Sequence, residues 1–157
     1  MRRALPLLAL VVPVLAACGG SSKPASKEDE PRLTQKQFVS AANQVCIRSD
    51  RRVYRIGNLS TDPEGWSKTV AAARTGIAEM AKLRPPARRE RQFEAMLATA
   101  QNLRTALADV RDALTARNYS KAQKAQGRAT TYDTSVKKQA SRLGLTFCEQ
   151  LLTNWPA

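Results

Sequence analysis

Three cysteines are the residues of this chain with the clearest chemistry. Cys18 follows an uncharged run and precedes a segment rich in glycine and serine, whereas Cys46 and Cys148 lie far apart in the remainder of the chain. The chain has no histidine, which removes the commonest general base and the commonest transition-metal ligand. The chemistry to expect is therefore that of thiols, rather than acid–base or metal-dependent catalysis.

Two pairs of carboxylates share a helix face, Glu90 with Glu94 and Asp109 with Asp112. Each pair has arginine neighbours, so we interpret these residues as surface ion pairs of a helix rather than as a general acid and base. A di-iron centre is excluded because its Glu-x-x-His motifs need histidine. The sequence therefore predicts a non-catalytic protein with no metal site and no cofactor.

The first 17 residues have the features of a secretory signal. Arg2 and Arg3 open the segment, and residues 4–17 carry no charge, which matches the charged start and short apolar region of a signal peptide. This uncharged run is too short for a transmembrane helix, which needs about 20 residues, and Pro6 and Pro13 interrupt it. We expect residues 1–17 to be a signal peptide that directs export.

The end of this segment, "LAAC" at residues 15–18, resembles the lipobox of bacterial lipoproteins. The resemblance implies that the Cys18 thiol receives a diacylglycerol group carrying fatty acids such as palmitate, and that the signal is cut just before Cys18. Two acyl chains anchor a protein stably, so we expect a protein held by its lipid on the extracytoplasmic face of the cell membrane. The alternative is an ordinary signal peptide in which Cys18 is incidental.

A tether is expected between the anchor and the folded domain. Residues 19–31, "GGSSKPASKEDEP", combine small residues, proline and mixed charge, a composition that cannot build a core and is typical of flexible linkers. We therefore assign residues 18–32 to the lipidated N-terminus and tether, and residues 33–157 to one folded domain.

The folded domain has the pattern of long helices. Residues 87–155 contain no proline and only two glycines, Gly127 and Gly144, so long helices can form there. Over residues 88–117 apolar residues recur at alternating steps of three and four, the spacing of one buried helical face. The inward positions of that helix are Phe93, Met96, Ala100, Leu103, Leu107, Val110 and Leu114.

Three further helices are expected over residues 35–56, 63–83 and 118–143, the last beginning near Asn118 or Ser120. Four helices of this length joined by short turns predict an all-α, up-down-up-down four-helix bundle. The inward positions of these three helices are Phe38, Ala42, Val45, Cys46, Ser49, Val53 and Ile56; Trp66, Val70, Ala73, Ile77 and Met80; and Ala122, Ala125, Ala129, Tyr132, Val136 and Leu143.

Local signals mark the ends of these helices. Thr34 with Gln37 forms a capping box, and Asp62 before Pro63 is an N-cap followed by proline at the first helical position. Gly144 is expected to cap the last helix at its C-terminal end.

Cys46 and Cys148 are expected to form a disulfide, because an exported chain with two remaining cysteines most simply pairs them. Closing a loop of about 100 residues contributes about 4.7 kcal/mol in the chain-entropy model. Cys46 lies about 18 Å along the first helix, so residues 145–154 must turn back as a short closing segment that carries Cys148, Leu151 and Leu152 inward. Two free thiols or a redox pair are the alternatives.

The chain also resembles a loose group of small, Ala- and Arg-rich helical lipoproteins of high-GC Gram-positive bacteria. The resemblance depends on the lipobox, on "FVSAANQVC" in the first helix and on "RLGLTFC" after the last. Members of that group are largely uncharacterised, so the resemblance implies an architecture and a location rather than an activity.

Basic residues are in large excess. Of 26 basic residues, Arg2 and Arg3 leave with the signal, and the remaining 24 against 13 acidic residues give a net charge of +11. Such a chain favours polyanions. Two clusters are candidate contacts, one along the first helix and one at the turn between the second and third, where it would face the membrane. Their members are Arg48, Arg51, Arg52 and Arg55, and Arg84, Arg88, Arg89 and Arg91.

These features predict a binding or structural module at the cell envelope. Its arginine clusters would contact anionic phospholipid or an anionic wall polymer, although a solvated basic surface is the simpler reading of such charge. Nucleic acid is not expected as a partner, since the protein is exported and no aromatic platform accompanies the arginines. The sequence identifies no protein partner. The alternative function is that of a small-ligand carrier with a cavity between its alanine-lined helices.

Overall fold

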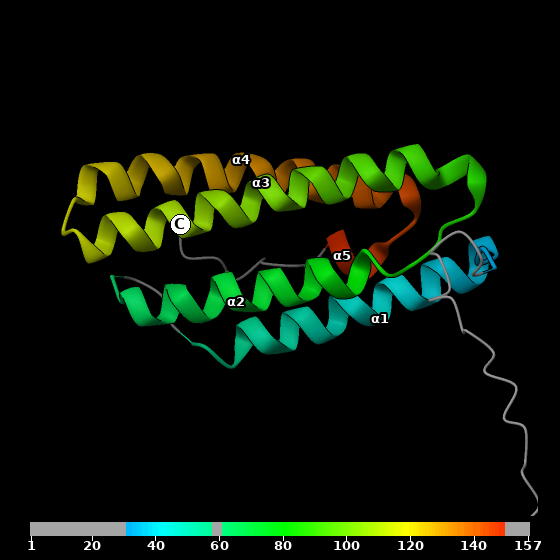
Figure 1. Cartoon of the computed structure of the whole chain (residues 1–157), viewed down its shortest axis with the longest axis horizontal. Helices are drawn as coiled ribbons and strands as arrows, with labels where there is room; N and C mark the ends of the chain where they lie inside the picture. The colour runs from blue at the N-terminus through cyan, green and yellow to red at the C-terminus, as the bar shows by residue number, and fades with distance from the viewer. Residues whose placement is uncertain (1–30, 58–60, 150–157) are drawn as a thin grey trace, which may run out of the picture. The chain divides into compact units, whose positions relative to one another are not determined.

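Four long helices follow one another in antiparallel order (Figure 1). The structure is a computed structural model, and it describes residues 31–57 and 61–149. The long helices are α1 (Gln35–Tyr54), α2 (Pro63–Met80), α3 (Glu90–Thr115) and α4 (Tyr119–Leu143), with a 3-10 turn η1 (Ala87–Arg89) before α3 and a short α5 (Thr146–Glu149) after α4. Within these described residues there is no strand. The predicted all-α four-helix bundle is confirmed.

The helices begin and end where the capping residues place them. The Thr34 hydroxyl accepts a hydrogen bond from the Gln37 N–H at 3.3 Å, and the Gln37 side chain accepts one from the Thr34 N–H at 3.0 Å. Asp62 caps α2 by accepting hydrogen bonds from two backbone N–H groups. Gly144 ends α4 with φ of 77°, a left-handed conformation that glycine adopts without steric penalty. All three predicted caps are confirmed.

Some boundaries differ by a few residues from the sequence-based ranges. The first turn before α3 is the 3-10 turn η1, because Pro85 and Pro86 hold the preceding chain extended. α1 ends at Tyr54 and α2 at Met80, so each ends a few residues before the limit of its predicted range, 56 and 83.

The hydrophobic core of the bundle has two halves. One half lies at the end where α1 begins, and it is built around Phe38, Phe93 and Leu143. The Phe38 and Phe93 rings meet edge to face, with centroids 5.2 Å apart. The other half lies at the opposite end, around Trp66 and Leu107.

Between these halves the inward positions are only partly buried. Val53, Ala73, Ile77, Ala100 and Leu103 are all predicted core residues, yet each keeps part of its surface exposed. The periodicity identified the correct side of each helix, but the middle of the bundle is less filled than its ends.

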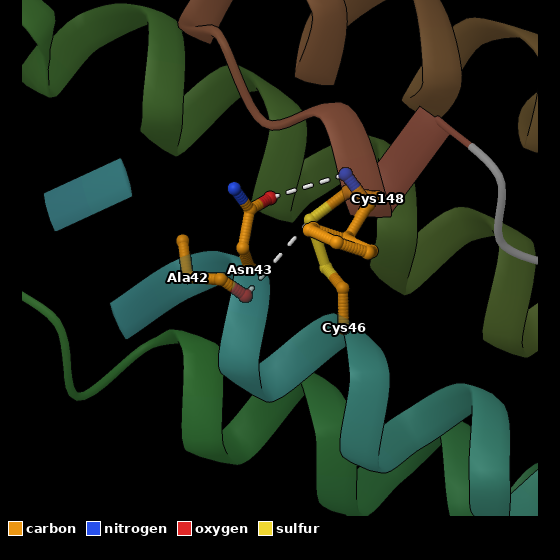
Figure 2. The surroundings of a disulfide bond; sticks show 5 residues. Ala42, Asn43, Cys46 and Cys148 are labelled. Atoms are coloured by element: carbon orange, nitrogen blue, oxygen red, sulfur yellow. Dashed lines mark hydrogen bonds between the residues drawn. A yellow bond between two sulfur atoms is a disulfide. The ribbon is translucent and has the colours of Figure 1, made fainter. Parts of the chain in front are cut away.

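A short closing segment follows α4. Leu145 is fully buried, and α5 brings Cys148 onto α1, where it is bonded to Cys46. Figure 2 shows this junction, in which the Asn43 side chain accepts a hydrogen bond from the Phe147 N–H at 3.2 Å. The Cys148 sulfur also lies 4.0 Å from the Ala42 carbonyl oxygen, a van der Waals contact because a disulfide sulfur carries no hydrogen.

The predicted disulfide is therefore confirmed, as is the return of the chain through residues 145–149. The rest of the predicted closing segment, with Leu151 and Leu152, lies outside the described residues. α5 packs against both α1 and α4, and α1 also contacts α4 directly, since the Gln35 side chain donates a hydrogen bond to the Leu143 carbonyl at 3.4 Å. The first and last long helices are thus joined both through α5 and by their own contacts in one half of the core.

Candidate ligand-binding cavity

An apolar cavity of about 130 Å³ lies in the middle of the bundle. Every long helix contributes to its lining, for example Val53 from α1, Ile77 from α2, Leu103 from α3 and Val136 from α4, and Cys148 adds a wall from α5. The cavity is half-enclosed. It explains the partial exposure of the central inward residues, since they face open space instead of one another.

The cavity is elongated along the bundle. Its lining runs from Thr69 to Met80 on α2 and from Met96 to Leu107 on α3, and in each case this corresponds to about 16 Å at 1.5 Å per residue. Met80 and Met96 belong to one half of the core and Leu107 to the other. The cavity therefore connects the two halves of the core.

Small residues bring α1 and α2 close together beside this cavity. A Cβ atom on Gly76 would overlap the Ser49 hydroxyl oxygen, so a larger residue at position 76 would force the Ser49 side chain or the helices to shift. The neighbouring Thr69 is buried, and its hydroxyl donates a hydrogen bond to the Gly65 carbonyl at 3.0 Å. The buried hydroxyl therefore has its hydrogen-bond partner within its own helix.

Asp133 is the one charged residue among the described lining residues. Its side chain is 19% exposed and pairs with Lys137, one turn further along α4, at 2.8 Å. Burial raises the pKa of Asp133, and the hydrogen bond and charge of Lys137 oppose that rise without cancelling it. The cavity thus has an apolar lining with a single ionisable group.

Asp133 is not among the candidate residues predicted from the sequence. Asp133 lies four residues after Ala129, on the inward side of α4. The sign of a special role was therefore a charged residue at a position where the helical period predicts an apolar one. With a lysine four residues later, the pattern is also that of an ordinary ion pair on a helix surface.

The first arginine cluster is partly occupied by ion pairs within the bundle. Arg48 and Arg52 of α1 both donate to Glu79 of α2. Burial tends to raise the pKa of Glu79, but the hydrogen bonds from the two arginines outweigh it and hold that pKa below 4.5. Arg51 and Arg55 are exposed. These arginines therefore join α1 to α2 as well as presenting charge outward.

The second arginine cluster lies where the chain enters the bundle. The Leu33 N–H donates to the Arg84 carbonyl at 2.9 Å, and Arg32 donates to Glu90 at 2.8 Å, which lowers the pKa of that carboxyl. Arg89 donates to Gln92 and to the Arg142 carbonyl at the end of α4.

Arg88 and Arg91 of the same cluster are exposed. The predicted position of this cluster, at the pole of the bundle where the preceding chain arrives, agrees with the Leu33–Arg84 contact.

Three of the four carboxylates considered above are paired with arginine. Glu90 pairs with Arg32, Asp109 with Arg128 at 2.7 Å, and Asp112 with its neighbour Arg111 at 2.8 Å. In the described part of the chain, no group of three or more Cys, Asp or Glu residues is arranged to hold a metal ion.

Comparison with protein-family models, with curated protein sequences and with solved structures finds no match to this chain. Among the helices of residues 31–57 and 61–149, none has the length and apolar character that a membrane span requires. Cys18 and the other residues of "LAAC" lie outside the described residues, so the lipobox stays a prediction.

Proposed function

We propose that this protein is a lipid-anchored protein of the cell envelope whose helical bundle binds an apolar small molecule. The observation that carries the proposal is the elongated apolar cavity, which lies where a four-helix bundle normally has the centre of its core. The arrangement favours the small-ligand carrier over a purely structural module.

An empty cavity of this size is unfavourable. At about 24 cal/mol per Å³, a fully enclosed void of 130 Å³ would destabilise a protein by about 3 kcal/mol, out of the 5–15 kcal/mol that typically holds a domain together. The cost here is smaller, because the cavity is only half-enclosed. The Cys46–Cys148 disulfide offsets this loss by stabilising the folded chain. A bound apolar molecule would restore the missing contacts, as an apolar cavity of similar volume in another protein takes up benzene.

The proposed location rests on the signal peptide and on the resemblance of "LAAC" to a lipobox. A bundle held at the membrane surface would meet apolar compounds where they are concentrated, either in the bilayer or at its boundary with water. The anchor and the cavity are independent parts of the proposal.

The test is the mass of native protein extracted from its host membranes, measured first under native and then under denaturing conditions. We expect a stoichiometric small molecule that is released on denaturation. The denatured protein should have the mass of residues 18–157 with a diacylglycerol group and one disulfide. A protein that carries no small molecule, and that takes up no apolar compound in titration, would contradict the binding function. A full-length or lipid-free mass would contradict the anchor alone.

A second candidate function is contact of the arginine pole with an anionic surface. It is supported by the position of exposed Arg88 and Arg91 beside the entry of the chain at Leu33. Each basic residue close to an anionic membrane adds about 1 kcal/mol, so Arg88→Gln with Arg91→Gln should weaken binding to anionic vesicles about 30-fold.

The matched control for this second function is Lys121→Gln with Lys124→Gln, which removes the same charge from exposed positions near the start of α4. Both pairs are tested in the mature chain with Cys18→Ser, so that the lipid does not dominate binding. Equal weakening by the two pairs would show that only net charge matters, and that the pole is not a specific contact.

A further inference from the structure

We infer that the occupant of the cavity is the unbranched acyl chain of a neutral, single-chain lipid. This inference rests on the proposed ligand-binding function and names the class of ligand. It depends on three features of the cavity: its length, the kind of side chains that line it, and the position of Asp133.

The length of the cavity favours a chain over a ring. A compact apolar cavity of about 150 Å³ holds a single benzene ring, and here about 130 Å³ extends along roughly 16 Å of α2 and α3. The same volume drawn out to this length is too narrow for a fused ring system. An extended chain advances about 1.2 Å per bond, so a tail of about a dozen carbons spans the length of the cavity. Its volume encloses about half of those carbons, by comparison with the benzene cavity, and the others lie along its open side.

The lining also favours an alkyl chain. No aromatic residue lies among the described lining residues, so the cavity offers no ring face on which an aromatic ligand could stack. Met80, Met96 and Leu97 line the end near the disulfide, and unbranched methionine side chains adapt to a flexible ligand. The walls are therefore suited to methylene groups.

Asp133 selects the head group. It is the charged residue of the lining and is paired with Lys137, so a polar head that leaves the apolar part of the cavity would lie beside this pair. The Lys137 ammonium is already engaged by Asp133, so the pair offers no net charge to an anionic head, and the carboxylate accepts a hydrogen bond from a hydroxyl. We therefore expect a head with hydroxyl groups and no net charge, as in a monoacylglycerol.

The test is calorimetric titration of the mature chain, residues 18–157 with Cys18→Ser, exported so that the disulfide forms. The substitution removes both the protein's own lipid and the need for detergent. The probes are monoacylglycerols with tails of 8 to 16 carbons, kept below the concentrations at which they aggregate. We expect the Kd to fall about fourfold for each added methylene until the tail reaches about twelve carbons, and to change little beyond that length.

Two variants locate the binding. Ala100 lines the cavity on α3, whereas Ala98 of the same helix is exposed and does not line it. Ala100→Phe fills the cavity and should abolish binding of every tail, while Ala98→Phe should leave each Kd unchanged. Thermal unfolding followed by circular dichroism establishes that both variants fold.

The head group is tested with a fatty acid of twelve carbons. We expect it to bind at least tenfold more weakly than the monoacylglycerol of equal length at neutral pH, and this difference should largely disappear in Asp133→Asn. Equal binding of the two heads to the unsubstituted chain would overturn the assignment of the head group.

The outcomes separate this inference from the function on which it rests. If a rigid tricyclic hydrocarbon binds as tightly as the best acyl chain and Ala100→Phe abolishes its binding, the acyl inference is wrong and the ligand-binding function stands. If neither class of compound binds, both are wrong. If Ala98→Phe weakens binding as much as Ala100→Phe does, the chain does not occupy the cavity and the inference falls.

Discussion

Asp133 is a carboxylate held beside an apolar cavity, and this position makes its ionisation unfavourable. Burial raises its pKa above the ordinary value of 3.8, in spite of the attraction of Lys137. A carboxyl whose pKa is higher in the folded than in the unfolded state favours folding when protonated. Its contribution is therefore complete at low pH, and it is lost as the pH rises through the raised pKa.

We predict that Asp133→Asn becomes more stable relative to the unsubstituted protein as the pH rises. Asparagine has nearly the same shape as the protonated carboxyl but does not ionise, so it avoids the unfavourable charge. The measurement is the Tm of both proteins between pH 3 and pH 8, with Asp50→Asn at an exposed position of α1 as the control. A Tm difference that does not grow with pH would show that Asp133 does not titrate as described.

Glu79 is the opposite case, a carboxylate whose charged form is held by two arginines. Because its pKa is lowered on folding, its contribution is present at neutral pH and is lost as the pH falls below 4.5 and through the lowered pKa. Glu79→Gln should reduce the free energy of unfolding by about 1 kcal/mol at pH 7, a figure that allows for the partial exposure of Arg48 and Arg52.

The measurement for Glu79→Gln is urea unfolding at pH 7 and at pH 3, with Glu94→Gln at an exposed position of α3 as the control. The loss should be much smaller at the lower pH. A loss of the same size at both pH values would mean that packing, and not charge, is what the substitution removes.

At the scale of the helices, glycine has two different roles. A Cβ on Gly76 of α2 would meet the Ser49 side chain of α1, whereas a Cβ on Gly127 of α4 would meet nothing within 4 Å. Alanine is favoured over glycine in a helix interior by about 1 kcal/mol. The same substitution should therefore have different effects at the two positions.

We predict that Gly127→Ala increases the free energy of unfolding by about 0.5–1 kcal/mol, and that Gly76→Ala gives less than this or a net loss. The comparison uses chemical unfolding of both variants under one set of conditions. If the two variants were equally stabilised, α1 and α2 would not be in close contact at Ser49.

The helices and their ends were largely predictable from sequence, because local signals determine them. Thr34, Asp62 and Gly144 are recognisable from a few neighbouring residues, and the apolar period places the inward side of each helix. The cavity was not predictable in this way. The period treats Phe93 and Leu103 alike, although Phe93 is 3% exposed and Leu103 faces the cavity, and that difference depends on how four helices meet.

The contacts around the candidate site were likewise predictable only in part. The partners of Arg48 and Arg52 could not be identified from sequence, because Glu79 lies about 30 residues away on the next helix. The disulfide could be predicted, since few pairings are open to three cysteines when one is expected to be acylated.

At the scale of the whole bundle, the disulfide closes a loop with a sequence separation of 102 residues. We predict that Cys46→Ala with Cys148→Ala lowers the free energy of unfolding by about 4.7 kcal/mol, through the larger entropy of the unfolded chain. Urea unfolding of the variant and of the oxidised protein gives this difference. Reduction of the unsubstituted protein should reproduce the loss, and an oxidised protein no more stable than the variant would contradict it.

The disulfide also determines how the bundle responds to mechanical force. A pull between residue 31 and residue 149 passes along the first turns of α1, crosses the sulfur–sulfur bond and leaves through the end of α5. Residues 47–147 form the loop that the disulfide bypasses, so their backbone bears none of that load. α2, α3 and α4 would therefore stay folded under a tension that unravels the beginning of α1. Only the residues outside the loop could be pulled out, so they would set how far the domain lengthens under force.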